Sequence, residues 1–271
     1  MSISPAEFMS AAPAPLSGNT PWASRYADEL RRVVVTHAAR APRSLQRHLG
    51  PSELGTPCDR QVAGKLAGLP TTNHVADPWP SVVGTAVHVW LAEAFAADNL
   101  RRNLLRWAPE VRVSPTDAHP GTADLYDAVE AAVVDHKVLG ETSMRKVQSA
   151  DGPPRRYVTQ LLLYGLGYRR LGLPVQRVVL AAYPRTSSTL DGLYVWERPY
   201  TPADDELIEQ VLEQTALRRE MAALLSAGYV ELRDIPCAPS DSECYFCPFY
   251  RPQSAHDGGS GCPGTVGNRP Q

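Results

Sequence analysis

The most constraining feature of the sequence is residues 121–138, GTADLYDAVEAAVVDHKV, which predict two short strands. The apolar run AAVV suits a strand that is buried on both faces. Asp135 and Lys137 follow it two residues apart, so strand alternation places both side chains on one side of the sheet and His136 on the other. Asp124 lies on the neighbouring predicted strand. Two carboxylates and an ammonium at the end of a hydrophobic strand indicate a site for a hard divalent cation.

Four short motifs follow one another along the chain, in an order that is more specific than any one of them. They are GTAVH at 84–88, GTAD at 121–124, DHK at 135–137 and QLLLY at 160–164. In this order they resemble the PD-(D/E)XK nucleases, and within them the RecB-like exonuclease branch, over about the middle third of the chain. The resemblance implies an α/β fold in which a mixed central sheet is flanked by helices. Without these neighbours, an Asp-x-Lys pair would be predicted to form an exposed ion pair.

The resemblance also implies an active site that hydrolyses DNA. Its ligands for Mg²⁺ or Mn²⁺ would be His88, Asp124, Asp135 and the main-chain carbonyl of His136. An imidazole nitrogen among carboxylates shifts the preference toward manganese, because nitrogen is the softer donor. Lys137 would orient or deprotonate the attacking water and offset the charge of the phosphate.

A helix predicted at 155–171 adds further residues to this site. Gln160 lies on one face with Arg156 and Tyr164, and a buried amide needs polar partners. The predicted catalytic residues are Asp124, Asp135, Lys137, Gln160 and Tyr164, and the predicted DNA contacts are Arg60, Arg156, Gln160 and Tyr164. We interpret Glu110, on a strand expected at 109–113, as a solvated residue, although an acid at this place helps to position metal or water in some relatives.

Five cysteines in a chain without an export signal favour metal ligation over disulfides. Cys244 and Cys247 form a C-x-x-C pair in a C-terminal segment that is too rich in Pro and Gly to build its own core. Cys58 before the nuclease motifs and a cysteine cluster after them resemble the iron-sulfur members of the family, namely the AddB nuclease domain and the CRISPR-associated exonucleases, in which one cysteine precedes the motifs and three follow. The resemblance implies a [4Fe-4S] cluster on Cys58, Cys244, Cys247 and Cys262. Fourteen residues separate Cys247 from Cys262, so Cys237 in place of Cys262 stays open, as does structural zinc.

Three segments are expected along the chain: a disordered N-terminus at 1–24, a RecB-like nuclease domain with an N-terminal helical part at 25–236, and a C-terminal cysteine segment at 237–271 that closes on Cys58. Periodicity and capping signals predict helices at 26–49, 81–99, 155–171 and 202–227, strands at 109–113, 175–183 and 193–200, and a mobile connection at 140–154.

Composition narrows the classes of function. No apolar run among the 271 residues approaches the length of a membrane span and no signal peptide begins the chain, so we expect a soluble, cytoplasmic protein without a membrane partner. The formal net charge of -2 argues against a generally basic surface, so DNA affinity would depend on local patches and on metal.

The expected function is that of a metal-dependent DNA exonuclease that acts at DNA ends, with single-stranded 5′ ends as a suitable substrate. Its setting would be recombination or repair, phage replication or CRISPR adaptation, with a recombination or CRISPR adaptation protein as partner. The alternative is a non-catalytic DNA-end-binding adaptor that keeps the nuclease frame. The complete set His88, Asp124, Asp135 and Lys137 favours the enzyme.

Overall fold

The computed structural model describes residues 20–40, 48–73, 77–238, 241–257 and 259–264. The chain divides into two compact units, 1–45 and 46–271, so the residues predicted as one domain at 25–236 belong to both. Most of the segment predicted to be disordered, 1–24, lies outside the described residues, as does part of the helix predicted at 26–49.

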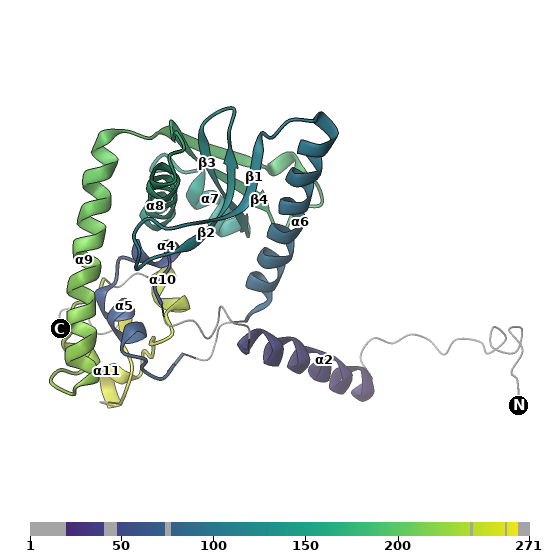
Figure 1. The fold of residues 1–271 in the computed structure, drawn as a ribbon. Helices are drawn as coiled ribbons and strands as arrows, with labels where there is room; N and C mark the ends of the chain where they lie inside the picture. Colours follow the sequence, from purple (N-terminus) through teal and green to yellow (C-terminus); the bar gives the residue numbers. More distant parts are fainter. Residues whose placement is uncertain (1–19, 41–47, 74–76, 239–240, 258, 265–271) are drawn as a thin grey trace, which may run out of the picture. The chain divides into compact units, whose positions relative to one another are not determined.

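The first unit contains the helix α2 (Pro21–Ala39), shown in Figure 1. It begins before the predicted residue 26 because Thr20 caps it, accepting a hydrogen bond from the main-chain nitrogen of Ala23, and because proline suits the first turn. None of the residues of α2 is buried. Some of its arginines pair with acids one turn away, as Arg31 does with Asp28 at 2.7 Å.

A mixed five-stranded sheet forms the centre of the second unit, in the order β1-β2-β3-β4-β5. The strands are β1 (Trp107–Val113), β2 (Gly121–Asp127), β3 (Ala132–Leu139), β4 (Arg177–Pro184) and β5 (Tyr194–Pro199). Only β3 and β4 are parallel, while the other neighbouring strands are antiparallel. The predicted α/β class, with a mixed sheet flanked by helices, is confirmed.

The parallel pair requires a crossover, which α7 (Glu141–Val147) and α8 (Arg155–Arg170) provide. The mobile connection predicted at 140–154 is therefore wrong in part. Met144 and Val147 of α7 are buried against the sheet, and this packing fixes a segment whose polar composition gave no signal for a helix.

Helices cover both faces of the sheet. The helix α8 packs on one face, whereas α6 (Trp79–Arg102) packs against β1, β2 and β3 on the other (Figure 1). The remaining elements are α4 (Pro51–Leu54), α5 (Asp59–Leu66), η1 (Leu190–Gly192), α9 (Pro202–Ser226), η2 (Leu232–Asp234), α10 (Asp241–Phe246) and α11 (Ser254–Asp257). Within the described part of the chain, no helix combines the length and the apolar character needed to span a membrane.

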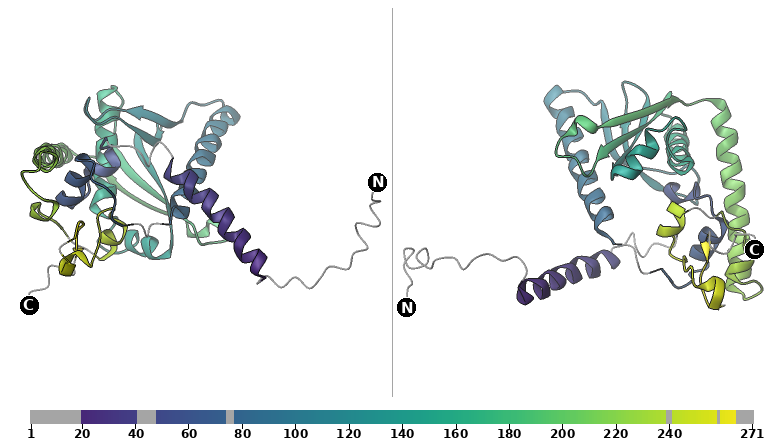
Figure 2. Two further views of the ribbon diagram at one scale, coloured as in Figure 1. Left: turned by 90° about the horizontal axis from the view of Figure 1, so that it is seen from below. Right: turned by 180° about the vertical axis from the view of Figure 1, so that it is seen from behind.

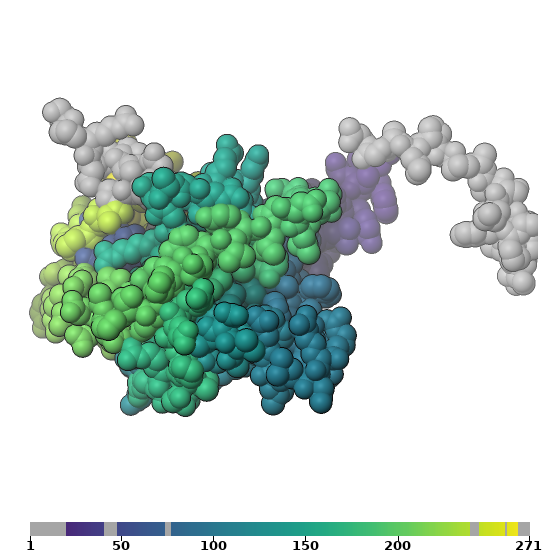
Figure 3. Space-filling view, turned by 90° about the horizontal axis from the view of Figure 1, so that it is seen from above, coloured from purple at the N-terminus to yellow at the C-terminus, as the bar shows by residue number. Residues whose placement is uncertain are grey.

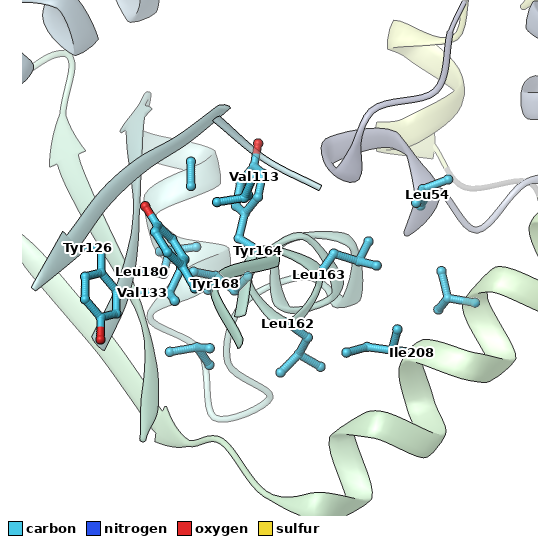
Figure 4. Close-up of a cluster of buried hydrophobic side chains, with 14 of the residues drawn as sticks. Leu54, Val113, Tyr126, Val133, Leu162, Leu163, Tyr164, Tyr168, Leu180 and Ile208 are labelled. Atoms are coloured by element: carbon cyan, nitrogen blue, oxygen red, sulfur yellow. The ribbon is translucent and has the colours of Figure 1, made fainter. Parts of the chain in front are cut away.

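The main hydrophobic core lies between the sheet and α8 (Figure 4). Leu161, Leu162 and Leu163 are three consecutive residues of α8, and all are fully buried. A helix that is apolar around most of its circumference must be covered on several sides. Strands β1 to β4 cover one side of α8, and Ile208 of α9 contributes to the cover on another.

The C-terminal segment packs around α5. Figure 2 and Figure 3 show this segment, in yellow, beside α9 in green. Phe249 is buried with Cys247 and Cys262, and the ring reaches the helix α5 at Gly64, where a β-carbon would lie 2.7 Å from the Phe249 Cε2 atom. The segment therefore has a core that it shares with α5, as expected of a tail too rich in Pro and Gly to build a core of its own.

Candidate active site and cysteine site

The candidate active site forms where the hydrogen-bonded ladder between β2 and β3 ends. Its last pair is Leu125 with Val134, and beyond it the carboxylate of Asp124 takes the place of a ladder carbonyl. The Asp124 Oδ2 atom accepts the main-chain N–H of His136 at 2.7 Å. The Oδ1 atom lies 3.3 Å from Nδ1 of His88 on α6. Asp124 is thus fixed from both sides, as the predicted site requires.

Three side chains at this point can bind one metal ion. Ligand atoms of His88, Glu110 and Asp124 all lie within 4.8 Å of one another. The strand register explains the meeting, because Pro109 pairs with Leu125 and Val111 with Ala123, which places Glu110 across from Asp124. Two carboxylates and an imidazole form a donor set that suits a divalent cation such as Mn²⁺.

Glu110 is the residue that the sequence interpretation assigned to solvent. Its side chain is exposed, yet its main chain has a φ of 53°, which is uncommon for a residue other than glycine. Although Glu110 is exposed by surface area, the surrounding protein atoms partly desolvate its carboxylate, and this together with the neighbouring Asp124 charge raises the pKa of Glu110 above its usual value. The left-handed conformation carries no signal in the sequence, so only the position of an acid on the strand before Asp124 could have indicated this role.

Asp135 and Lys137 form an ion pair beside these ligands. The carboxylate of Asp135 is completely buried, and Nζ of Lys137 lies 2.5 Å from its Oδ2 atom. Apart from that ammonium, no hydrogen-bond donor in the described part of the chain reaches either oxygen. Burial raises the pKa of Asp135 to about 6, against the opposing charge of Lys137. A buried carboxylate with so few donors has free lone pairs for a cation.

The helix α8 holds the other side of Lys137. Oε1 of Gln160 accepts a hydrogen bond from Lys137 Nζ at 3.1 Å, and Nε2 of Gln160 donates to the Tyr164 hydroxyl at 3.5 Å. The Lys137 ammonium also lies 5.1 Å from the centre of the Tyr157 ring. The structure therefore brings the predicted residues Lys137, Gln160 and Tyr164 together, and it adds Tyr157, for which the sequence gave no signal.

The side chain of His136 lies on the opposite side of the sheet from Asp135 and Lys137, as strand alternation predicts. Its ring stacks on Phe95 of α6 with centroids 5.6 Å apart, and it contacts Tyr183 edge-on at 5.5 Å. Burial lowers the pKa of His136 to about 4, so the ring is neutral at ordinary pH. This ring helps to hold α6, and with it His88, against the sheet.

Burial and mutual attraction act in opposite directions on the ionisation of Asp124 and His88. Burial disfavours the charge on Asp124, but the hydrogen bond and the charge of His88 outweigh it, so the pKa of Asp124 lies below its usual value. Burial likewise acts against the charged form of His88, but Asp124 prevails and the pKa of His88 is raised. In the metal-free protein His88 is thus paired with Asp124 through a proton, and a cation bound by both side chains would take the place of that proton.

All five cysteines line a second site, which is a cavity on the side of α5. Cys58 caps α5, Cys237 follows η2, and the other three belong to the C-terminal segment. None of them forms a disulfide. Within the described residues no three of the sulfurs lie within 4.8 Å of one another. Cys58 lines this cavity together with the cysteines of the tail, and both Cys237 and Cys262 are among them, so the choice of the fourth ligand stays a prediction.

The two arginines predicted to bind DNA occupy different places. Arg156 is exposed at the start of α8, with its guanidinium 5.1 Å from the centre of the Tyr157 ring, the same ring that Lys137 Nζ approaches to 5.1 Å. Arg60 lies at the cysteine cavity, where Nη1 donates to Cys262 Sγ at 3.1 Å and Nε donates to the Ile235 carbonyl at 2.9 Å. The structure thus groups Arg156 with the acidic site and Arg60 with the cysteines.

Neither a protein-family model nor a curated protein sequence matches this chain. Among solved structures, an alkaline exonuclease from Laribacter hongkongensis is similar, with a TM-score of 0.46 at 12% identity over 68% of this chain and 93% of that chain. The complex of that exonuclease with dAMP has a TM-score of 0.45 at 13% identity, with the same coverage of the two chains. A phage-related exonuclease from Haemophilus somnus 129PT gives 0.40 at 13% identity, over 64% and 82% of the two chains. These likenesses are partial, and the function proposed below rests on the site.

Proposed function

We propose that this protein is a metal-dependent nuclease that hydrolyses phosphodiester bonds at DNA ends. The observation that carries the proposal is the meeting of two groups at the end of the β2–β3 ladder. One group is the three possible ligands His88, Glu110 and Asp124. The other is the buried pair of Asp135 and Lys137. A cation site next to a held ammonium is the arrangement needed to bind and polarise a phosphate.

His88, Glu110 and Asp124 would hold one divalent ion, and Asp135 would join them through the lone pairs that its contact with Lys137 leaves free. The imidazole nitrogen favours Mn²⁺ over Mg²⁺. Bound there, the ion would act as a Lewis acid on the phosphate and on water. The main-chain carbonyl of His136 stays a predicted further ligand.

Lys137 would place the attacking water and offset the charge that develops on the phosphate. Its ammonium is held on one side by Asp135 and on the other by Oε1 of Gln160, so it does not have to be ordered when substrate arrives. Tyr164 holds Gln160 in turn. Arg156 lies at the same end of α8 and would contact the DNA backbone, together with Gln160 and Tyr164.

We further propose that the cysteine cavity holds a [4Fe-4S] cluster on Cys58, Cys244, Cys247 and Cys262. Four thiolates around one zinc ion would lie about 3.8 Å apart, given a Zn–S bond of about 2.3 Å. Cysteines that line one cavity without three of their sulfurs lying close together are compatible with ligands that bind separate iron atoms. The group would hold the C-terminal segment to α5, and reduced thiols of this kind fit a cytoplasmic protein.

The motif resemblance extends the proposal to the substrate and setting: DNA with single-stranded 5′ ends, in recombination, repair, phage replication or CRISPR adaptation, alongside a partner protein from one of these processes. The first test compares manganese binding by calorimetry with DNA hydrolysis. We expect Asp124→Asn to lose both, because it removes a ligand, and Lys137→Ala to bind manganese but lose hydrolysis. Equal loss of metal binding in the two variants would contradict the assigned roles, and DNA binding without hydrolysis by the unaltered protein would favour the adaptor.

A further inference from the structure

Arg60 has an unusual set of partners for a half-buried arginine. Its Nη1 atom donates to Cys262 Sγ at 3.1 Å, its Nε atom to the Ile235 carbonyl at 2.9 Å, and its Nη2 atom to the Arg233 carbonyl at 2.7 Å. Its main-chain nitrogen donates to the Pro236 carbonyl at 3.0 Å. Among the ion pairs of the described residues, none includes Arg60. The guanidinium therefore faces carbonyls and a sulfur, without a carboxylate to balance its charge.

A half-buried guanidinium has lost part of its hydration, so a nearby opposite charge stabilises it. The sulfur of Cys262 is the one partner among the three side-chain contacts that can carry negative charge. A thiolate that ligates metal keeps its charge, and an N–H donor pointed at its sulfur withdraws electron density from it. Hydrogen bonds to ligand sulfurs and net charge are among the factors that set the potential of an iron-sulfur group.

We propose that Arg60 is a positioning residue of the cysteine site: its hydrogen bond selects Cys262, and not Cys237, as the fourth ligand, and its charge makes the bound cluster easier to reduce. This inference rests on the cysteine site proposed above. Arg60 also ties together three parts of the chain that the site needs. It lies two residues after Cys58, it holds the carbonyls of the turn that leads to Cys237, and it reaches Cys262 directly.

Hydrogen bonds around Cys58 also hold the start of α5, from which Arg60 extends, in a fixed position. Asp59 accepts from Nε of Arg218 at 2.8 Å and from Gln214 at 2.8 Å, and Arg218 also donates to the Thr56 carbonyl at 2.8 Å. The residues on both sides of Cys58 are thus fixed to α9 before any metal binds. Arg60 extends the same rigid start of α5 to the C-terminal segment.

The test uses the full-length protein, reconstituted anaerobically with iron and sulfide. Arg60→Met removes the charge and the donors but keeps a long stem, whereas Arg60→Lys keeps the charge. The control is Arg233→Met, because Arg233 is exposed and paired with Glu231. The measurements are iron and sulfide content, melting temperature, and the midpoint potential by spectroelectrochemical titration.

We expect Arg60→Met to shift the reduction equilibrium by at least tenfold toward the oxidised form, about 59 mV for a one-electron couple. Arg60→Lys should lie between Arg60→Met and the unaltered protein, and Arg233→Met should match the latter. If Arg60→Met cannot hold a cluster, the midpoint potential of Arg60→Lys is the deciding measurement: a value below that of the unaltered protein supports the role of Arg60, and an equal value contradicts it. Cys262→Ser should lose iron and Cys237→Ser should keep it.

The outcomes separate the two proposals. A loaded protein whose potential is the same with Arg60→Met, or which loses iron with Cys237→Ser but not with Cys262→Ser, would overturn the role of Arg60 alone. An unaltered protein that takes up no iron-sulfur group would overturn the cluster and, with it, this inference. Nuclease activity at the acidic site is measured separately and is not needed for either result.

Discussion

Removal of the Lys137 charge should destabilise the metal-free protein, because it leaves the Asp135 carboxylate alone in the core. Asp135 is completely buried and Lys137 is its sole close partner among the described donors. Breaking a buried pair by removing one member costs about 3–5 kcal/mol. The side chain of Lys137 is 18% exposed, so we expect the lower end, about 3 kcal/mol for Lys137→Met at pH 8.

The cost should depend on pH in a defined direction. The folded-state pKa of Asp135 is about 6, above its ordinary value of 3.8, so the stabilisation from a protonated Asp135 is present at low pH and is lost as the pH rises through 6. Without Lys137 the carboxylate can bind a proton instead. The cost of Lys137→Met should therefore fall by about 1.4 kcal/mol for each pH unit below 8 until protonation is complete.

Urea unfolding in the presence of a chelator, at pH 8, 7 and 6, measures this effect. The double variant Asp135→Asn, Lys137→Met serves as the matched control, and it should recover most of the lost stability because no unpaired charge remains. A cost below about 1 kcal/mol at pH 8, or a cost that does not change with pH, would refute the reasoning, since either result would mean that no uncompensated charge remains buried at Asp135.

Three further predictions concern other parts of the molecule. Manganese affinity, measured by calorimetry, should fall as the pH drops, first because the ion must displace the proton of His88, whose pKa is raised, and then, through about 6, the proton of Asp135; an affinity that is constant from pH 5 to 8 would exclude both as ligands. Asp204→Asn should cost about 1–3 kcal/mol at pH 7, since Asp204 caps α9 at Thr201 and pairs with Arg198. The hydrogen bonds with Arg198 outweigh burial and hold the pKa of Asp204 below 3.8, so the difference should disappear in urea unfolding only as the pH falls below that value. Gly64→Ala should cost about 1–3 kcal/mol and lower the iron content, because its β-carbon would meet the buried Phe249 ring, whereas Gly84→Ala, with no atom within 4 Å, should lose no thermal stability.

The fold was largely predictable from residues 121–138 and their neighbours. The alternation of Asp135, His136 and Lys137 gave the correct faces, and the apolar run before them gave the buried strand β3. Local patterns also placed α6, α8 and α9 close to their observed bounds. They failed at α7, where the helix depends on burial of Met144 against the sheet.

The candidate site was predictable where strand alternation and motif order decide geometry, and not where the main chain departs from regular structure. Glu110 lies beside His88 and Asp124, and its main chain in β1 has a left-handed conformation that no local sequence pattern predicts. Arg60 resembles any surface arginine in the sequence, and only the return of the C-terminal segment brings Cys262 to it. Contacts between residues 202 positions apart depend on the whole fold.

The most direct test of the central claim is DNA degradation by the purified protein with manganese. End-labelled linear and circular single strands are the substrates, and Lys137→Ala is assayed beside the unaltered protein. We predict that the unaltered protein consumes the linear strand from its ends and leaves the circle intact, and that the variant binds manganese and DNA but degrades neither. Binding of DNA by both proteins without degradation by either, with the acidic site loaded, would contradict the assignment of this site to phosphodiester hydrolysis.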